Sequence, residues 1–331
     1  MNDVTLEGLE AFLAGREEFL VTAHIDPDGD AVGSCLGLKL ALDHMGKTAE
    51  VVLDSPVPAA LLFLPAASTI RRPDHVQKKF DSAFVLDSSS LDRTGSVPER
   101  CLNPGAKIAV FDHHWGNDGF GDIRLVNPEA SATAELVYDV IDLLHIPISP
   151  EIAECLYAGI LSDTGGFRYA NTSSRTLRVA ARLVERGARA PVVAEALYAT
   201  KTAPSLRILG LALASLETRS GGRIGAMTIS RDMFERAGAT PEDADGIVQY
   251  AKALAGARVG VLVQEVAPNE IRASLRSDGT VDVNEVASLF GGGGHRNAAG
   301  LRVRGDLERV RNDLYEALDR AMNGGPPPSA G

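Results

Sequence analysis

Short apolar runs alternate with segments of helical periodicity over the first 185 residues. The apolar runs have the length of strands, and the segments between them carry apolar residues at every third or fourth position. We predict strands at 19–23, 49–53, 82–87 and 107–112, and helices at 36–42, 131–141 and 149–158. Strands that alternate with helices in this way are typical of an α/β domain with a mostly parallel sheet.

The pattern changes between residues 186 and 205. Gly187, Pro191 and Pro204 surround a short helical stretch there, which indicates a helical linker. Beyond it, helices predicted at 206–216, 243–254, from 283 onward and at 307–321 mix with strands predicted at 224–229, 258–265, 270–277 and 299–303. This order predicts a smaller α+β domain. The resulting division has a first domain at 1–185, a linker at 186–205, a second domain at 206–322 and a disordered Gly-, Pro- and Ser-rich tail at 323–331.

Composition narrows the class of protein without naming a function. The net charge of −11 argues against binding of long duplex nucleic acid, which relies on many Lys and Arg residues. No apolar run approaches the ~20 residues of a membrane span, and the first residues lack the features of a signal peptide. Cys35, Cys101 and Cys155 are far apart and form no C-x-x-C pair, as expected in a reducing compartment. We therefore expect a cytoplasmic protein without membrane contact.

One loop carries a dense set of polar side chains. After the first predicted strand, His24 is followed by Asp26, Asp28 and Asp30. Carboxylates that close repel each other by roughly 3 kcal/mol per pair at ~5 Å and an effective dielectric of ~20. A bound cation would convert this repulsion into attraction. Taken alone, the stretch is equally compatible with an ordinary solvated turn, because Asp, Pro and Gly are common turn residues.

Two more predicted strands end in similar residues. Asp87 ends one of them, and Asp112, His113 and His114 follow the next, while Asp163 enters a Gly-rich turn after a predicted helix. Because ligands bind outside the carboxyl ends of strands in open α/β sheets, these ends indicate one shared site. Carboxylates with a few imidazoles suit Mn²⁺ or Mg²⁺, and no cysteine lies nearby to favour structural zinc. Two such cations about 3.5–4 Å apart can drive a phosphoryl displacement, and a carboxylate must then bridge them.

These motifs together resemble a known family. The pattern His24-x-x-x-Asp28-x-Asp30, a strand-end Asp87, the Asp112-His113-His114 triplet and Asp163-Thr164-Gly165 are similar, in order, to the motifs of the DHH phosphoesterase superfamily. The run 291–300, Gly-Gly-Gly-Gly-His-Arg-Asn-Ala-Ala-Gly, resembles the glycine-rich signature of DHHA1 domains. The resemblance covers nearly the whole chain. In size and order it is similar to the stand-alone oligoribonucleases (nanoRNases) and 3'-phosphoadenosine 5'-phosphate (pAp) phosphatases.

The resemblance implies two divalent cations, most simply Mn²⁺, with Mg²⁺ or Co²⁺ as alternatives. The implied ligands are His24 and Asp28 for one cation, Asp30, His113 and Asp163 for the other, and Asp87 as the bridge. His114 takes the position of a histidine that faces the scissile phosphate. Asp112 is expected to orient a ligand imidazole from behind. The family spacing skips Asp26, which we expect to be a capping or solvated side chain.

In the second domain, the glycine run and one strand are candidate substrate contacts. Gly292, Gly293 and Gly294 offer backbone N–H groups that no side chain obstructs, and His295 and Asn297 follow within reach of phosphate and sugar. A flexible loop is the simpler interpretation of this run.

Arg272, Ser274 and Arg276 alternate along a predicted strand and therefore point to one face of it. Guanidinium groups on that face can bind a terminal phosphate through two hydrogen bonds each. The simpler interpretation is a solvent-exposed basic strand.

The implied activity is that of a metal-dependent phosphodiesterase and phosphatase. Hydroxide held by the two cations attacks phosphorus, the cations and His114 stabilise the developing charge, and the 3'-oxygen leaves. The implied substrates are very short RNAs, degraded to mononucleotides, and pAp, converted to AMP.

Other functions stay open at this stage. A phosphodiesterase for cyclic dinucleotides (cyclic di-AMP or cyclic di-GMP) or linear dinucleotides would use the same catalytic residues. A non-catalytic RNA- or nucleotide-binding module belongs to another class, and DHHA1-like domains also occur in alanyl-tRNA synthetases. The complete set of metal-ligand candidates speaks against that module. The sequence does not decide whether the chain forms a homodimer.

Overall fold

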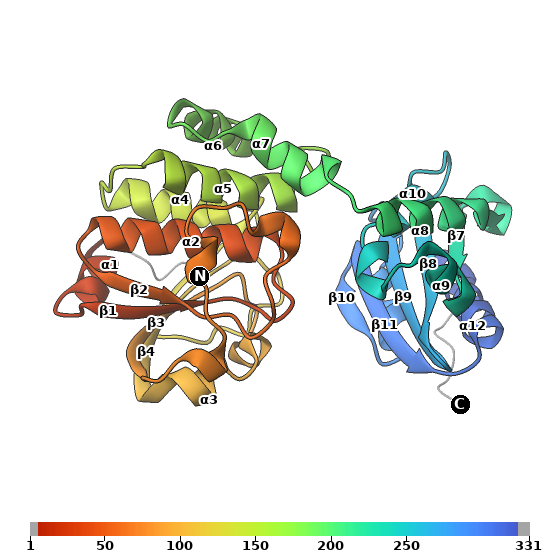
Figure 1. Cartoon of the computed structure of the whole chain (residues 1–331), viewed down its shortest axis with the longest axis horizontal. Coiled ribbons are helices and arrows are strands. Elements are labelled where there is room, and N and C mark those ends of the chain that lie inside the picture. The colour runs from red at the N-terminus through yellow and green to blue at the C-terminus, as the bar shows by residue number, and fades with distance from the viewer. Residues whose placement is uncertain (1–5, 324–331) are drawn as a thin grey trace. The chain divides into compact units, whose positions relative to one another are not determined.

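A computed structural model describes residues 6–323. The chain divides into two compact units, and the boundary between them lies between Thr200 and Lys201 (Figure 1). This division lies inside the segment expected to link two domains. No helix in the described part of the chain is long and apolar enough to cross a membrane.

A five-stranded parallel sheet forms the centre of the first unit, in the order β2-β1-β3-β4-β5. Its strands are β1 (Glu18–Thr22), β2 (Thr48–Val51), β3 (Phe80–Leu86), β4 (Leu102–Asp112) and β5 (Ile123–Val126). Strand β2 lies on one side of β1, towards one edge of the sheet. Strands β3, β4 and β5 follow on the other side, towards the opposite edge, so the strand order reverses between β1 and β3. Such a reversal leaves a crevice at the carboxyl ends of the two strands, where ligands bind in open α/β sheets.

Helices cover both faces of this sheet. They are α1 (Leu6–Leu13), α2 (Gly29–His44), α3 (Val97–Cys101), α4 (Thr133–Leu143), α5 (Pro150–Asp163), α6 (Ser174–Glu185) and α7 (Ala190–Ala194). In Figure 1, α2, α4 and α5 lie on one face with α6 and α7 outside them, and α3 lies on the opposite face. The first face buries a cluster of phenyl rings, in which Phe84 lies with ring centroids 5.2 to 5.6 Å from those of Phe12, Phe19 and Phe111.

The second unit contains a mixed six-stranded sheet in the order β10-β11-β9-β8-β7-β6. Its strands are β6 (Glu217–Arg219), β7 (Ile224–Ile229), β8 (Val259–Ala267), β9 (Glu270–Ser277), β10 (Gly293–His295) and β11 (Ala298–Arg304). The helices are α8 (Ala203–Ala214), α9 (Arg231–Ala237), α10 (Val248–Lys252), α11 (Val283–Ser288) and α12 (Leu307–Met322). Helices α8 to α10 bury one face of the sheet, and α11 and α12 bury the other. The predicted fold class, a mostly parallel α/β domain followed by an α+β domain, is confirmed.

Several local predictions differ from the structure for physical reasons. The helix expected at 243–254 is broken, because Gly246 has a φ of +80° between a 3-10 turn (Pro241–Ala244) and α10. The edge strand β5 was not expected, since it has no buried face that would give an alternating pattern. In the linker, α7 packs against the first unit by burying Val193. The tail predicted at 323–331 lies outside the described residues, apart from Asn323, the C-cap of α12.

Helices α2 and α5 approach each other closely at Gly33. A Cβ atom on Gly33 would lie 2.4 Å from the Cys155 carbonyl oxygen and 2.9 Å from the Gly159 nitrogen. Real contacts of this kind are not that short, so the helices would have to separate. The small residue therefore fixes the packing of the helix that begins at the acidic loop.

We expect Gly33→Ala to destabilise the first unit by about 1–3 kcal/mol, because the added methyl group overpacks this helix crossing. Gly210→Ala in α8 is the matched control, since nothing lies within 4 Å of its added Cβ. That change is expected to be neutral or to stabilise by up to ~1 kcal/mol through helix propensity. Thermal unfolding of both variants measures the difference. Equal midpoints for the two would contradict the close helix contact.

Candidate metal centre

Polar side chains gather where the order of the parallel sheet reverses. Strand β1 leads into the loop with His24 and Asp28, β3 leads into Asp87, and β4 leads into His113 and His114. Parallel strands bring their carboxyl ends to one edge of a sheet, so residues far apart in the sequence meet there. The shared site expected from the sequence at these strand ends is therefore formed.

Three overlapping groups of these residues could each hold a metal ion. Within each group, one ligand atom per residue lies within 4.8 Å of the others. The groups are His24, Asp28 and Asp87; Asp30, His113 and Asp163; and Asp87, His113 and His114. The structure thus brings together all of the metal-ligand candidates named from the sequence. Which cation each one holds stays a prediction.

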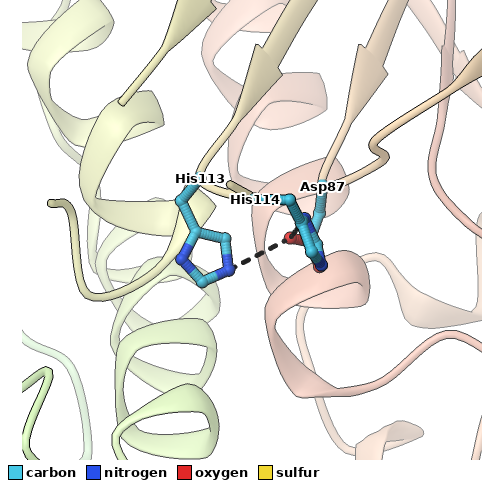
Figure 2. A group of neighbouring side chains, drawn as sticks. All are labelled: Asp87, His113 and His114. Atoms are coloured by element: carbon cyan, nitrogen blue, oxygen red, sulfur yellow. Dashed lines mark ion pairs between the residues drawn. The ribbon is translucent and has the colours of Figure 1, made fainter. Parts of the chain in front are cut away.

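The carboxylate of Asp87 lies between the groups. Its Oδ2 is 3.5 Å from His24 Nε2, and its Oδ1 is 3.6 Å from His113 Nε2. Figure 2 shows the His113 ring directed towards this carboxylate. Asp87 is 2% exposed and has a φ of +52°, a left-handed conformation that Asp tolerates better than most residues. Asp87 therefore contacts histidines of two different ligand groups, and its role as a bridge between cations stays a prediction.

Backbone carbonyls orient the rings of His24 and His113 through Nδ1. His24 Nδ1 donates a hydrogen bond to the Ile25 carbonyl oxygen at 2.7 Å, and His113 Nδ1 donates to that of Ala130 at 3.3 Å. A carbonyl oxygen only accepts, so the proton belongs on Nδ1. In the neutral ring, Nε2 then keeps its lone pair and points at the carboxylates, as in metal sites whose ligands are oriented from behind. The donor set therefore fits divalent cations.

Protons compensate the carboxylate charge in this cluster. Burial lowers the pKa of His24 and of His113, but the nearby carboxylates outweigh it and raise both pKa values to about 9. Burial raises the pKa of Asp163 to about 7, against the opposing charge of His113. Burial and the charge of Asp87 also raise the pKa of Asp30. Burial acts in the same direction on Asp87, but contacts with the three histidines hold its pKa below the usual range.

Asp112 contacts a different imidazole from the one expected. It is buried, and its Oδ1 accepts a hydrogen bond from His114 Nδ1 at 2.6 Å. Its Oδ2 accepts from Asn117 Nδ2 at 2.7 Å. Asp112 therefore orients His114, the predicted phosphate-facing residue, whereas the predicted cation ligand His113 is held by a backbone carbonyl.

Sequence reasoning missed two residues that shape the cluster. Asn117 fixes Asp112, as described above, and Thr133 at the start of α4 donates its hydroxyl proton to Asp87 Oδ1 at 3.0 Å. Both lie in loops or helix starts, where Asn and Thr are common. The sequence offers one signal for Thr133, namely its place at the start of a helix, two residues after Ser131. In the structure, the Ser131 hydroxyl donates to Glu135 at 2.8 Å.

Asp26 and Trp115 stay outside the three groups. Asp26 is exposed in a left-handed turn with a φ of +54°. Trp115 is 76% exposed directly after the histidine pair.

The second unit contains a shallow groove lined by the predicted substrate contacts. Its volume is about 540 Å³, and its lining includes Arg272, Ser274 and Arg276 of β9 with residues 292–294 of the glycine run. Side chains on β9 alternate between buried and half-buried, so the three polar residues share the open face, as predicted. A Cβ on Gly294 would lie 2.5 Å from the Ala298 carbonyl oxygen, so this tight β10–β11 hairpin requires glycine.

Two further predicted substrate contacts, His295 and Asn297, lie in the β10–β11 hairpin. Asn297 is exposed in the turn between β10 and β11, and its carbonyl oxygen accepts from Ser277 N at 2.9 Å. The backbone of His295 pairs with Ala298, but its side chain lies outside the described part of the structure. Arg272 reaches Asp245 in the same unit, with 3.2 Å between Nη2 and Oδ1.

We expect the Mn²⁺ affinity of the protein to increase with pH. A cation must displace protons from His24 and His113, whose pKa values are raised to about 9, and from Asp163, whose pKa is about 7. The increase is therefore steepest below about pH 7, continues towards pH 9 and stops above it. Calorimetric titration of the chelator-treated protein with MnCl₂ at several pH values measures this, and a pH-independent affinity would contradict the proton competition.

Family comparisons agree with the motifs in both units. The DHH family, N-terminal domain, matches residues 18–160, and the DHHA1 domain matches residues 220–324. A protein of Thermus thermophilus named bifunctional oligoribonuclease and PAP phosphatase NrnA is 37% identical over 317 residues, which cover 94% of each chain.

Solved structures show the same architecture. An exopolyphosphatase-related protein from Bacteroides fragilis superposes with a TM-score of 0.90 at 26% identity, covering 96% of this chain and 97% of that one. RecJ of Thermus thermophilus in complex with Mn²⁺ shares the fold at 15% identity and a TM-score of 0.55, covering 98% of this chain and 55% of RecJ. With these matches, the chain belongs to the DHH family of hydrolytic phosphoesterases, in the form that carries a DHHA1 domain after the DHH domain.

Proposed function

We propose that the chain hydrolyses short oligoribonucleotides to mononucleotides and pAp to AMP with the help of two divalent cations. The observation that carries this proposal is the buried Asp87 carboxylate, whose two oxygens face His24 and His113 of different ligand groups. The name of the Thermus thermophilus relative supports the substrate class, since that protein is called an oligoribonuclease and PAP phosphatase.

The proposed ligand assignment follows the groups in the structure. One cation is assigned to His24 and Asp28, the other to Asp30, His113 and Asp163, with Asp87 shared between them. We propose Mn²⁺ as the preferred ion, with Mg²⁺ or Co²⁺ as substitutes, because the donors are carboxylate oxygens and imidazoles. Such cations, when bound, polarise phosphoryl oxygens and make a nucleophile available at neutral pH.

The residues of the chain itself orient the phosphoryl group. Asp112 Oδ1 accepts a hydrogen bond from His114 Nδ1 and so fixes the orientation of the His114 ring. We assign His114 to the scissile phosphate, where the imidazolium form of its ring stabilises the charge that develops in the transition state. Because Asp112 is buried and also fixed by Asn117, the ring is held in place before substrate arrives.

In the DHHA1 unit, we assign the groove to the substrate. The proposed contacts are Arg272, Ser274, Arg276, Gly292, Gly293, Gly294, His295 and Asn297. A terminal phosphate suits the arginines, because planar guanidinium groups bind phosphate oxygens in pairs. The groove is small and the net charge of the chain is −11, which supports short substrates over long ones.

The three cysteines are buried and unpaired, which supports a reducing compartment, and we propose the cytoplasm. Sedimentation analysis would decide whether the chain forms a homodimer, which the sequence leaves open.

We expect the protein with Mn²⁺ to hydrolyse a linear diribonucleotide and pAp with higher kcat/KM than cyclic di-AMP or inorganic polyphosphate. Polyphosphate belongs in the assay because the Bacteroides fragilis structure is named exopolyphosphatase-related. Preferred turnover of polyphosphate or of the cyclic dinucleotide would replace the proposed substrate. Tight nucleotide binding without hydrolysis by Mn²⁺, Mg²⁺ or Co²⁺ would favour a non-catalytic module.

Asp87→Asn is expected to abolish turnover of both substrates, because an amide cannot supply two anionic oxygens to two cations. The loss should exceed the ~10–100-fold typical of residues that only support metal ligands. Asp26→Asn is the matched control, since it changes an exposed aspartate of the neighbouring loop that belongs to none of the groups. Retained activity in the Asp87 variant would exclude the shared-carboxylate arrangement.

Arg272→Ala is expected to raise KM for pAp by about tenfold or more, since a charged hydrogen bond contributes ~1.5–3 kcal/mol. Its kcat should change little, because Arg272 is proposed to bind a phosphate other than the one that is hydrolysed. Arg309→Ala on α12, another exposed arginine of the same unit, serves as the control. Steady-state kinetics of both variants measure the effect, and an unchanged KM in the first would remove Arg272 from the substrate site.

A further inference from the structure

Thr133, the first residue of α4, connects carboxylates of both proposed cation sites. It is fully buried. Its backbone N–H donates to Asp30 Oδ2 at 2.6 Å, and its hydroxyl donates to Asp87 Oδ1 at 3.0 Å. Asp30 belongs to one ligand group, and Asp87 shares another with His24 and Asp28. A single residue therefore contacts a ligand from each group.

The start of α4 has no cap from its own segment. The N-cap position is Ala132, whose side chain accepts no hydrogen bond. Asp30 takes this role from α2, because its two oxygens accept the N–H groups of Thr133 and Ala134 at 2.6 and 2.9 Å. Ser34 donates to the same carboxylate at 3.1 Å. The orientation of Asp30 is thereby tied to the helix backbone.

The hydroxyl of Thr133 is free to reach outward because of its position. Inside a helix, a threonine hydroxyl commonly bonds a carbonyl of the preceding turn, but the first helical residue has no preceding turn. Its branched side chain also has few allowed rotamers, so the bond to Asp87 holds that carboxylate in a defined orientation. The same carboxylate also contacts His24, His113 and His114.

We infer that Thr133 is a positioning residue whose hydroxyl sets the orientation of Asp87 relative to Asp30, and with it the geometry of the carboxylates that would hold the two cations. The inference rests on the cation centre of the proposed function and deepens it. Thr133 itself touches neither cation nor substrate in this arrangement. It acts through the two carboxylates.

The test compares Mn²⁺ binding by variants that differ in the hydroxyl group. Thr133→Val keeps the shape of the side chain and leaves the backbone N–H groups of residues 133 and 134 bonded to Asp30, but it removes the hydroxyl. This change is expected to weaken Mn²⁺ binding by about 10–100-fold. Thr133→Ser restores the hydroxyl and should bind close to the parent protein. Calorimetric titration of the chelator-treated proteins with MnCl₂, without substrate, gives the readout.

A second pair of variants provides the same comparison if Thr133→Val fails to fold. Thr133→Ala and Thr133→Ser both lack the methyl group and differ only in the hydroxyl, so their difference measures the same hydrogen bond. Thr176→Val is the matched control, because Thr176 is another buried threonine whose hydroxyl donates to a carboxylate, that of Glu135 at 3.2 Å. It should leave Mn²⁺ affinity unchanged.

The outcomes separate this inference from the proposed function. Equal Mn²⁺ affinity in parent and Thr133→Val, or a Ser variant as weak as the Val or Ala variant, would overturn the role of the hydroxyl. If the parent binds Mn²⁺ yet hydrolyses neither oligoribonucleotide nor pAp, the proposed substrates fail, while the Mn²⁺ titrations still decide the role of Thr133. A parent protein that binds no divalent cation would overturn both.

Discussion

The repulsion among buried carboxylates at the edge of the first sheet is the constraint on which this structure depends. Asp28, Asp30, Asp87 and Asp163 lie close enough together that the charge of one raises the pKa of another. Two of them are held by helix N-termini: Asp28 caps α2, and Asp30 accepts N–H groups at the start of α4. Helix N-termini favour negative charge, so the fold stabilises the anions locally and leaves the rest of the compensation to imidazoles and cations.

The topology of the sheet explains why these groups meet. The sequence positions run from His24 to Asp163, but parallel strands deliver their ends to one edge, and the reversal between β1 and β3 opens that edge. Asp163 arrives from the end of α5, which packs along α2 through Gly33. A helix C-terminus disfavours negative charge, so a nearby cation would stabilise the Asp163 carboxylate.

The ligand candidates named from the sequence lie together in the structure, because most of them belong to short motifs at strand ends and Asp163 ends α5. Their role as ligands stays a prediction. Thr133 and Asn117 could not be found in this way, since they act through single hydrogen bonds that depend on tertiary placement. For the same reason Asp112 was expected behind a cation ligand and instead supports His114. Among the elements, the longer strands and the helices α2, α4 and α5 were predicted, whereas α6 was not, although it has one buried face. Strand β5 and the helix broken at Gly246 were not, because their patterns lack a clean period.

The dependence of α4 on Asp30 also bears on the order of folding. The residues that form this cap are 103 and 104 positions apart in the sequence, so it closes only after α2 has docked near β3 and β4. A helix that lacks a local cap gains its first turn late, because a long loop must close before the contact forms. The ligand geometry is therefore completed in the same step that completes the α2–α4 packing, and partly folded chains lack the arrangement that holds cations.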